Sequence, residues 1–214
     1  MIRVLVLGAT GRAGSATLTH LAGRTDTIAA VRAGHEPGRL PAQVRTAVID
    51  LDDPDTVREA ARGVDVVVNA IRLRGDIPDT ALIELHHRIL DAAPDPGALT
   101  VVTVGGAGSL RLPGGVRFWQ DPAFPAPTLP RGRAHAKLRD HLEAGHAGDR
   151  WAYLIPPPDF APDAPARGTY RSFESGADES VFTRCSISYL DYAHALASTA
   201  AERRLGTALI AGGR

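Results

Sequence analysis

The sequence predicts an α/β fold in which helices flank a doubly wound parallel sheet and a small C-terminal cap follows. Three observations support this prediction. Short apolar runs alternate with helical patterns through residues 1–155, as in βαβ units with right-handed crossovers. The first run ends in a glycine-rich turn at residues 8–14. The alternation stops at three consecutive prolines, residues 156–158, where the chain can no longer continue a strand.

Six strands are expected in the first part of the chain. Their sequences are apolar and rich in β-branched residues, because both faces of a parallel sheet are covered by helices. The predicted strands are residues 2–7, 27–31, 44–49, 64–69, 99–104 and 151–155.

Four helices are expected between these strands, at residues 15–22, 53–62, 78–93 and 132–145. Asp53 and Pro54 open the second helix, because Asp caps a helix well and Pro fits the first helical position. Residues 33–44 are expected to form a loop with at most a short helix. Residues 105–130 are rich in glycine and proline, so no long regular element is expected there.

The chain is expected to divide at residue 155 into a sheet domain, residues 1–155, and a cap or substrate region, residues 156–214, integrated with the same domain. Turns and short strands are expected at residues 159–185, a helix at 189–204 and a last strand at 207–211. We expect this tail to lie over the carboxyl ends of the strands.

Composition excludes several classes of protein. The chain has 214 residues, of which 44% are hydrophobic, too many for a disordered chain. Its formal net charge is zero, so no global basic field recruits nucleic acid. No apolar run approaches the roughly 20 residues of a membrane span. The single cysteine excludes an internal disulfide and fits a reducing compartment. We therefore expect a cytoplasmic monomer or homodimer without a metal site.

The turn after the first strand reads Gly8-Ala9-Thr10-Gly11-Arg12-Ala13-Gly14. Between a buried strand and a helix, glycines let the backbone approach a diphosphate, and the helix N-terminus offers free N–H groups. This context indicates a Rossmann-type domain that binds a nicotinamide dinucleotide. We predict cofactor contacts at residues 8 and 10–14. The alternative is a purely structural turn.

Arg32, at the end of the second predicted strand, favours NADP over NAD. Domains specific for NAD place an acidic residue there for the ribose 2′-hydroxyl, whereas arginine suits a 2′-phosphate. The next acidic residue is Glu36, and Arg12 can reach the same region. Arg32 could instead be a solvated arginine at a strand end.

Further cofactor contacts are expected where the later strands end. Asp50 and Leu51 would lie beside the adenine, although Asp50 could equally be a turn residue or a helix cap. The three residues after the fourth strand would line the two riboses. The remaining predicted contacts are Asn69, Ala70, Ile71, Gly105 and Pro156.

The glycine turn and Val31-Arg32 together resemble the atypical short-chain dehydrogenases/reductases. Within them the chain looks most like the NAD(P)H-binding, NmrA-like group that includes NADH-flavin reductases and relatives of biliverdin reductase B. The resemblance continues through residues 102–110, 122–125, 155–158 and 187–196. It implies a nicotinamide cofactor and oxidoreductase activity.

The chain departs from this family's usual proton donor. Short-chain dehydrogenases typically use Tyr-x-x-x-Lys, in which the lysine holds the nicotinamide ribose and lowers the pKa of the tyrosine. Lys137, the only lysine, fills the lysine position, and the resemblance implies that it contacts the nicotinamide ribose of the cofactor. Arg133 stands where the tyrosine is expected. Glycines replace the serine that often follows the fifth strand, and Ser109 comes later.

The catalytic residues are therefore unknown from sequence. Lys137, Ser109 and Tyr170 are candidates, and Tyr189 is a further candidate for a proton donor. Lys137 could also be a solvated helix residue. His135 is expected to point away from the site, because two positions on a helix separate it from Lys137.

We expect an NADPH-dependent oxidoreductase that passes hydride to a small planar acceptor, such as a flavin or quinone. Such an acceptor needs orientation more than a dedicated acid. Aromatic residues in the long loop and the tail could stack on it, or could simply pack the cap onto the sheet. The alternative is a non-catalytic, NAD(P)-binding redox sensor of the NmrA type. A sugar-nucleotide epimerase is disfavoured, because the chain lacks Tyr-x-x-x-Lys and a larger substrate domain.

Overall fold

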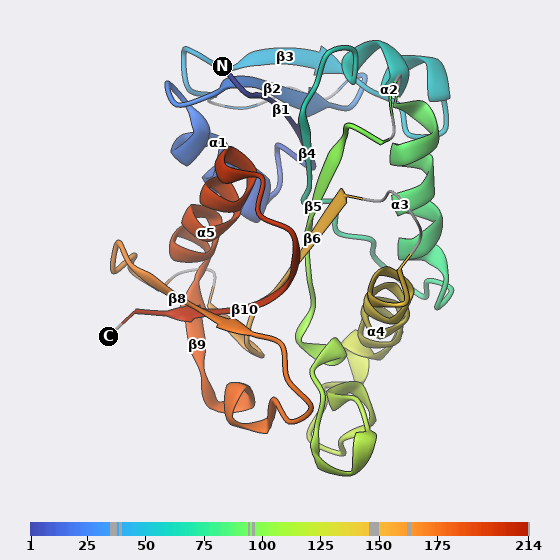
Figure 1. Cartoon of the computed structure of the whole chain (residues 1–214), viewed down its shortest axis with the longest axis vertical. Helices are drawn as coiled ribbons and strands as arrows, with labels where there is room; N and C mark the ends of the chain where they lie inside the picture. The colour runs from blue at the N-terminus through green and yellow to red at the C-terminus, as the bar shows by residue number, and fades with distance from the viewer. Residues whose placement is uncertain are drawn as a thin grey trace.

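The computed structural model describes residues 1–34, 38, 40–93, 95, 97–145, 150–161 and 164–213. Within them an eight-stranded sheet has the order β3-β2-β1-β4-β5-β6-β10-β8 (Figure 1). Neighbouring strands are parallel throughout, except that β8 runs antiparallel to β10. The strands are β1 (Arg3–Leu7), β2 (Asp26–Val31), β3 (Arg45–Val48), β4 (Val66–Asn69), β5 (Thr100–Val104), β6 (Arg150–Ile155), β8 (Tyr170–Glu174) and β10 (Gly206–Gly212).

Helices cover both faces of this sheet. In Figure 1, α1 (Arg12–Leu21) and α5 (Tyr189–Glu202) lie on one face of the sheet. The other layer holds α2 (Pro54–Ala60), α3 (Ala81–Ala92) and α4 (Leu129–Glu143). The doubly wound Rossmann-type prediction is therefore confirmed.

Alternating side chains of the strands build the two cores. In β1, Leu5 and Leu7 pack into the core beneath α2, α3 and α4, whereas Val4 and Val6 pack into the core beneath α1 and α5. All four are at most 1% exposed. Burial on both faces explains why this strand reads as a continuous apolar run.

Most predicted elements are present with shifted ends. The first helix begins at Arg12 rather than at residue 15, because its first turn is formed by the glycine-rich segment itself. Asp53 caps α2 as predicted, and its side chain accepts a hydrogen bond from the Asp55 N–H at 3.0 Å. Residues 105–130 contain four short 3₁₀ helices, η1 (Ala107–Ser109), η2 (Pro113–Gly115), η3 (Phe118–Gln120) and η4 (Ala126–Thr128).

The predicted loop at residues 33–44 lies partly outside the described residues, which exclude 35–37 and 39. Its described residues contain no helix. The predicted short strands of the tail are β7 (Asp159–Ala161) and β8. A short strand that we did not predict, β9 (Ser186–Ser188), pairs with β7. In the described residues, no helix combines the length and apolar character needed to cross a bilayer.

Residues 156–214 do not lie only at the carboxyl ends of the strands; they also add strands to the sheet and a helix to one of its faces. β10 extends the sheet beyond β6, and α5 packs beside α1. The Tyr192 hydroxyl of α5 donates to the Leu154 carbonyl of β6 at 2.6 Å. The division at residue 155 stays a prediction, and the second segment is tightly integrated with the first.

Arg139 of α4 holds the tail and the long loop together. Its side chain is fully buried and forms an ion pair with Glu179 at 2.7 Å. It also donates to the Ser109 carbonyl at 2.7 Å and to the Ser175 hydroxyl at 2.6 Å. This network fixes α4 against η1 and against residues 175–179.

Replacing Glu179 with Gln should destabilise the fold by up to about 3–5 kcal/mol, because the buried guanidinium of Arg139 loses one charged partner and keeps Glu143, at 2.9 Å. Urea unfolding followed by circular dichroism measures this loss. Glu174→Gln is the matched control, because Glu174 is exposed on β8. Equal free energies of unfolding for the two variants would show that the buried pair does not hold the tail.

Candidate functional site

A cavity of about 1530 Å³ runs along the carboxyl ends of the parallel strands. Its lining comes from the segments that follow β1, β2, β3, β4, β5 and β6. The chain reverses its winding direction between β1 and β4, and this switch point is where doubly wound sheets bind ligands. Helices α3 and α4 supply one wall, and the segment after β6 supplies another.

The glycine turn brings the start of α1 against the end of β1. Gly8 has φ +71°, and the Gly11 N–H donates to its carbonyl at 2.9 Å. A Cβ on Gly14 would lie 2.2 Å from the Gly8 oxygen, so only glycine permits this approach. No side chain caps α1, and its first turn holds no acidic residue. Its open N-terminus therefore fits a diphosphate.

The cavity brings together most of the predicted cofactor contacts. They come from the ends of six different strands and from the start of α1. Those that line the cavity are Gly8, Thr10, Gly11, Arg12, Ala13, Arg32, Asp50, Leu51, Ala70, Ile71, Gly105 and Pro156.

Three predicted contacts are not part of the lining. Gly14 lies behind the turn, where it permits the close packing of α1. Asn69 is buried, and its side-chain oxygen accepts from the Ile71 N–H at 3.2 Å, which shapes the turn after β4. Lys137 is exposed on α4, so this geometry does not support its predicted ribose contact.

Asp50 combines two of the roles that the sequence left open. Its carboxylate accepts a hydrogen bond from the Asp52 N–H at 3.0 Å, as a turn residue does, and it also lines the cavity.

Arg12 and Arg32 line the same end of the cavity and are exposed. No ion pair involves either of them within the described residues.

Two of the catalytic candidates lie away from the cavity. Ser109 is fully buried, and its hydroxyl donates to the Gly106 carbonyl at 2.7 Å. The Tyr170 hydroxyl accepts from Arg204 at 3.3 Å. Neither residue lines the cavity. Tyr189 does, and its ring stacks on Phe160 with the centroids 3.9 Å apart.

The orientation predicted for His135 is wrong. His135 lines the cavity, whereas Lys137 lies on the exposed side of α4. Two helical positions separate side chains by about 200°, so only one of the pair can face the site. The inward position stacks the imidazole over Gly106, where a Cβ would lie 2.4 Å from the ring.

Tyr153 fixes the imidazole of His135. Its hydroxyl oxygen lies 2.9 Å from His135 Nδ1 and accepts the Gly106 N–H at 3.2 Å. Burial lowers the pKa of His135 to about 4, and the positive charge of Arg131 acts in the same direction. Burial also raises the pKa of Tyr153 to about 12. Both groups are therefore neutral near pH 7. We assign the tyrosine proton to Nδ1, which leaves the imidazole hydrogen on Nε2.

Aromatic side chains divide between the site and the core. Those that line the cavity are Phe118, Phe124, Phe160 and Tyr189. Phe118 and Phe124 meet edge to face with centroids 5.3 Å apart. Other tail aromatics, such as Phe182 and Tyr192, are buried in the two cores.

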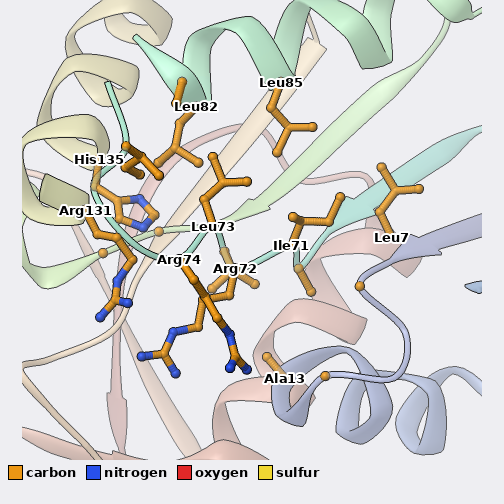
Figure 2. A pocket seen from close by; sticks show the side chains of 18 of the residues that line it. Leu7, Ala13, Ile71, Arg72, Leu73, Arg74, Leu82, Leu85, Arg131 and His135 are labelled. Atoms are coloured by element: carbon orange, nitrogen blue, oxygen red, sulfur yellow. The ribbon is translucent and has the colours of Figure 1, made fainter. Parts of the chain in front are cut away.

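Four arginines of the lining were not predicted from the sequence. One of them, Arg88 of α3, pairs with Asp52 at 3.1 Å. The other three have no such partner among the described residues. Arg72 and Arg74 follow β4, and Arg131 lies in the first turn of α4. Figure 2 shows their guanidinium groups turned into the same part of the cavity, with His135 beside Arg131. The alternation Arg72-Leu73-Arg74 was the available signal, because residues two apart in an extended segment share a side.

The chain belongs to the NAD(P)H-binding family, whose model matches residues 8–203. Its cofactor class is therefore a nicotinamide dinucleotide. No curated protein sequence matches the chain significantly.

Solved structures share the fold over nearly the whole chain. A proposed epimerase from Bacteroides thetaiotaomicron is 24% identical, with a TM-score of 0.83 and coverage of 100% of this chain and 98% of that one. A proposed exported protein from Burkholderia pseudomallei is 26% identical, with a TM-score of 0.80 and coverage of 99% and 100%. A proposed NADH-flavin reductase from Streptococcus pneumoniae is 24% identical, with a TM-score of 0.78 and coverage of 100% of both chains.

The lowered pKa of His135 predicts a specific pH dependence. The folded protein prefers the neutral ring, so this preference stabilises the fold fully above pH 6.5 and is lost as the pH falls from 6.5 towards about 4. The difference in free energy of unfolding between the wild type and His135→Gln should shrink over that interval. Urea unfolding at several pH values measures it. A ring-proton NMR shift of His135 with a midpoint near pH 6.5 would contradict the assignment.

Proposed function

We propose that the protein is an NADPH-dependent oxidoreductase that passes hydride to a small planar acceptor such as a flavin or quinone. One observation carries the proposal. A single cavity connects the open N-terminus of α1 with a compartment lined by aromatic side chains and by neutral His135. When bound, the nicotinamide cofactor would supply the hydride.

The glycine turn and two arginines support binding of the cofactor at one end. The N–H groups at the start of α1 suit the diphosphate, because they carry partial positive charge and no side chain occupies them. Arg32 and Arg12 are exposed beside the segment that follows β2. Neither guanidinium group forms an ion pair in the part of the chain that the structure describes, and both suit a 2′-phosphate, which supports NADP over NAD.

The other end of the cavity suits a flat acceptor. Phe160 and Tyr189 form a stacked pair on one wall, and the Phe118–Phe124 pair contributes to another. Aromatic faces bind planar rings through dispersion and quadrupole interactions. The volume of about 1530 Å³ exceeds the roughly 300–1,000 Å³ of a site for one drug-sized ligand, so it accommodates a dinucleotide and an acceptor together.

The residues around the acceptor supply orientation rather than a strong acid. Arg133, at the position of the usual tyrosine, pairs with Asp79 at 3.2 Å outside the cavity. His135 can donate its Nε2 hydrogen to a carbonyl or ring nitrogen of the acceptor, and Tyr153 holds it in place. The acceptor gains a hydride and afterwards takes a proton from solvent. Placement at roughly 3–3.5 Å is the main requirement for such a transfer.

The decisive experiment is turnover. Mixing the protein with NADPH and either a flavin or a small quinone in a stopped-flow instrument should consume NADPH faster than the mixture without protein. Loss of nicotinamide absorbance measures the rate. Tight binding of the cofactor without turnover of any acceptor would refute the oxidoreductase proposal and leave the redox sensor.

Arg32→Ala tests the cofactor preference. A charge-assisted phosphate contact contributes roughly 1.5–3 kcal/mol, so the variant should bind NADP about ten- to a hundredfold more weakly and NAD with little change. Isothermal calorimetry measures both affinities. Arg24→Ala is the matched control, because Arg24 is an exposed arginine outside the cavity. Equal losses for NADP and NAD would exclude a 2′-phosphate contact by Arg32.

A further inference from the structure

Three guanidinium groups gather on one wall of the cavity. Arg72, Arg74 and Arg131 all line the cavity, and no ion pair or hydrogen bond involves their side chains within the described residues. Figure 2 shows the three groups directed into the same space. Arginines so placed repel one another unless an anion lies between them.

Two separate elements build this cluster. After β4, Arg72 and Arg74 point into the cavity (Figure 2), while Leu73 between them packs against the core beneath α3 and also lines the cavity. Arg131 lies one turn before His135 on α4, and residues four apart share a helix face. The next arginine of that helix, Arg133, faces away and pairs with Asp79.

The electrostatic environment of Arg131 agrees with an anion site. Burial lowers the pKa of Arg131, and the positive charges of Arg72 and Arg74 lower it further, against an opposing contribution from Tyr189. The acidic residues of the lining, Asp50, Asp52 and Glu84, belong to the segment after β3 and to α3.

We propose that Arg72, Arg74 and Arg131 form an oxyanion subsite for the acceptor, whose planar ring would carry a phosphate or carboxylate group. This inference rests on the proposed function and names its substrate class. Under the proposed function, the cofactor's own phosphates would have other partners, namely the start of α1 and the Arg12–Arg32 end. Arg131 instead stands beside His135 and Tyr189, where the acceptor ring would lie.

Binding of FMN and riboflavin tests the subsite directly, because the two share one ring system and differ by a phosphate. Quenching of flavin fluorescence, with and without saturating NADP⁺, gives both dissociation constants. We expect FMN to bind at least about tenfold more tightly than riboflavin, which corresponds to about 1.4 kcal/mol. Rising salt should weaken FMN binding and leave riboflavin unchanged.

Substitutions then locate the contact. Arg131→Gln and Arg74→Gln should each remove most of the preference for FMN, whereas Arg133→Gln, on the same helix but outside the cavity, should retain it. Circular dichroism checks that each variant is folded.

A naphthoquinone with a carboxylate, compared with its neutral parent, distinguishes the two sources of the anion. A preference in the quinone pair alone assigns a carboxylate, and one in the flavin pair alone assigns a phosphate.

Equal affinities within both pairs would overturn the subsite. So would a variant that weakens NADP⁺ as much as FMN, since the arginines would then hold the cofactor. Because these measurements record binding, they are independent of turnover. An FMN preference that depends on the arginines, without consumption of NADPH, would refute the proposed hydride transfer and leave the anion site intact.

Discussion

The contact between Gly8 and Gly14 determines where the site can form. It allows the first turn of α1 to start directly against the end of β1, with a separation that any Cβ at position 14 would prevent. The N–H groups of that turn consequently face the gap between β1 and β4, where the winding of the sheet reverses. The place of the open helix N-terminus on the cavity depends on this steric constraint.

A second constraint, the buried ion pair of Arg139 and Glu179, positions α4, which forms one wall of the cavity. Burying Arg139 is costly, since an ion loses its hydration, and Glu179 and the Ser109 carbonyl offset much of that cost through short hydrogen bonds. The buried pair fixes the rotation of α4 about its axis. Arg131 and His135 then face the cavity, and Lys137 faces solvent. The network is therefore structural, yet it decides which residues reach the ligand.

Features that depend on residues close together in the chain could be predicted from the sequence. The glycine turn, Arg32 and the Asp53 cap each follow from a local pattern, and the apolar alternation gave the sheet and its helices. The sequence could not predict the arginine cluster, because β4 and α4 meet only through folding. The orientation of His135 was also predicted wrongly, because the family motif drew attention to Lys137. The buried residues Gly132, Leu138 and Leu142 show which side of α4 faces the protein. Ser109 was misleading for a similar reason: its hydroxyl serves the backbone of its own turn.

The neutral state of His135 limits the chemistry that the site can perform. A charged imidazole would add a fourth positive charge beside Arg131, and burial together with that arginine prevents this by lowering the pKa of His135. A neutral ring held by Tyr153 can donate a hydrogen bond but is a poor source of protons. Under the proposed function, the site therefore favours acceptors that hydride alone reduces to a stable anion, with protonation by solvent. Flavins and quinones have this property, whereas simple ketones need an acid during the transfer.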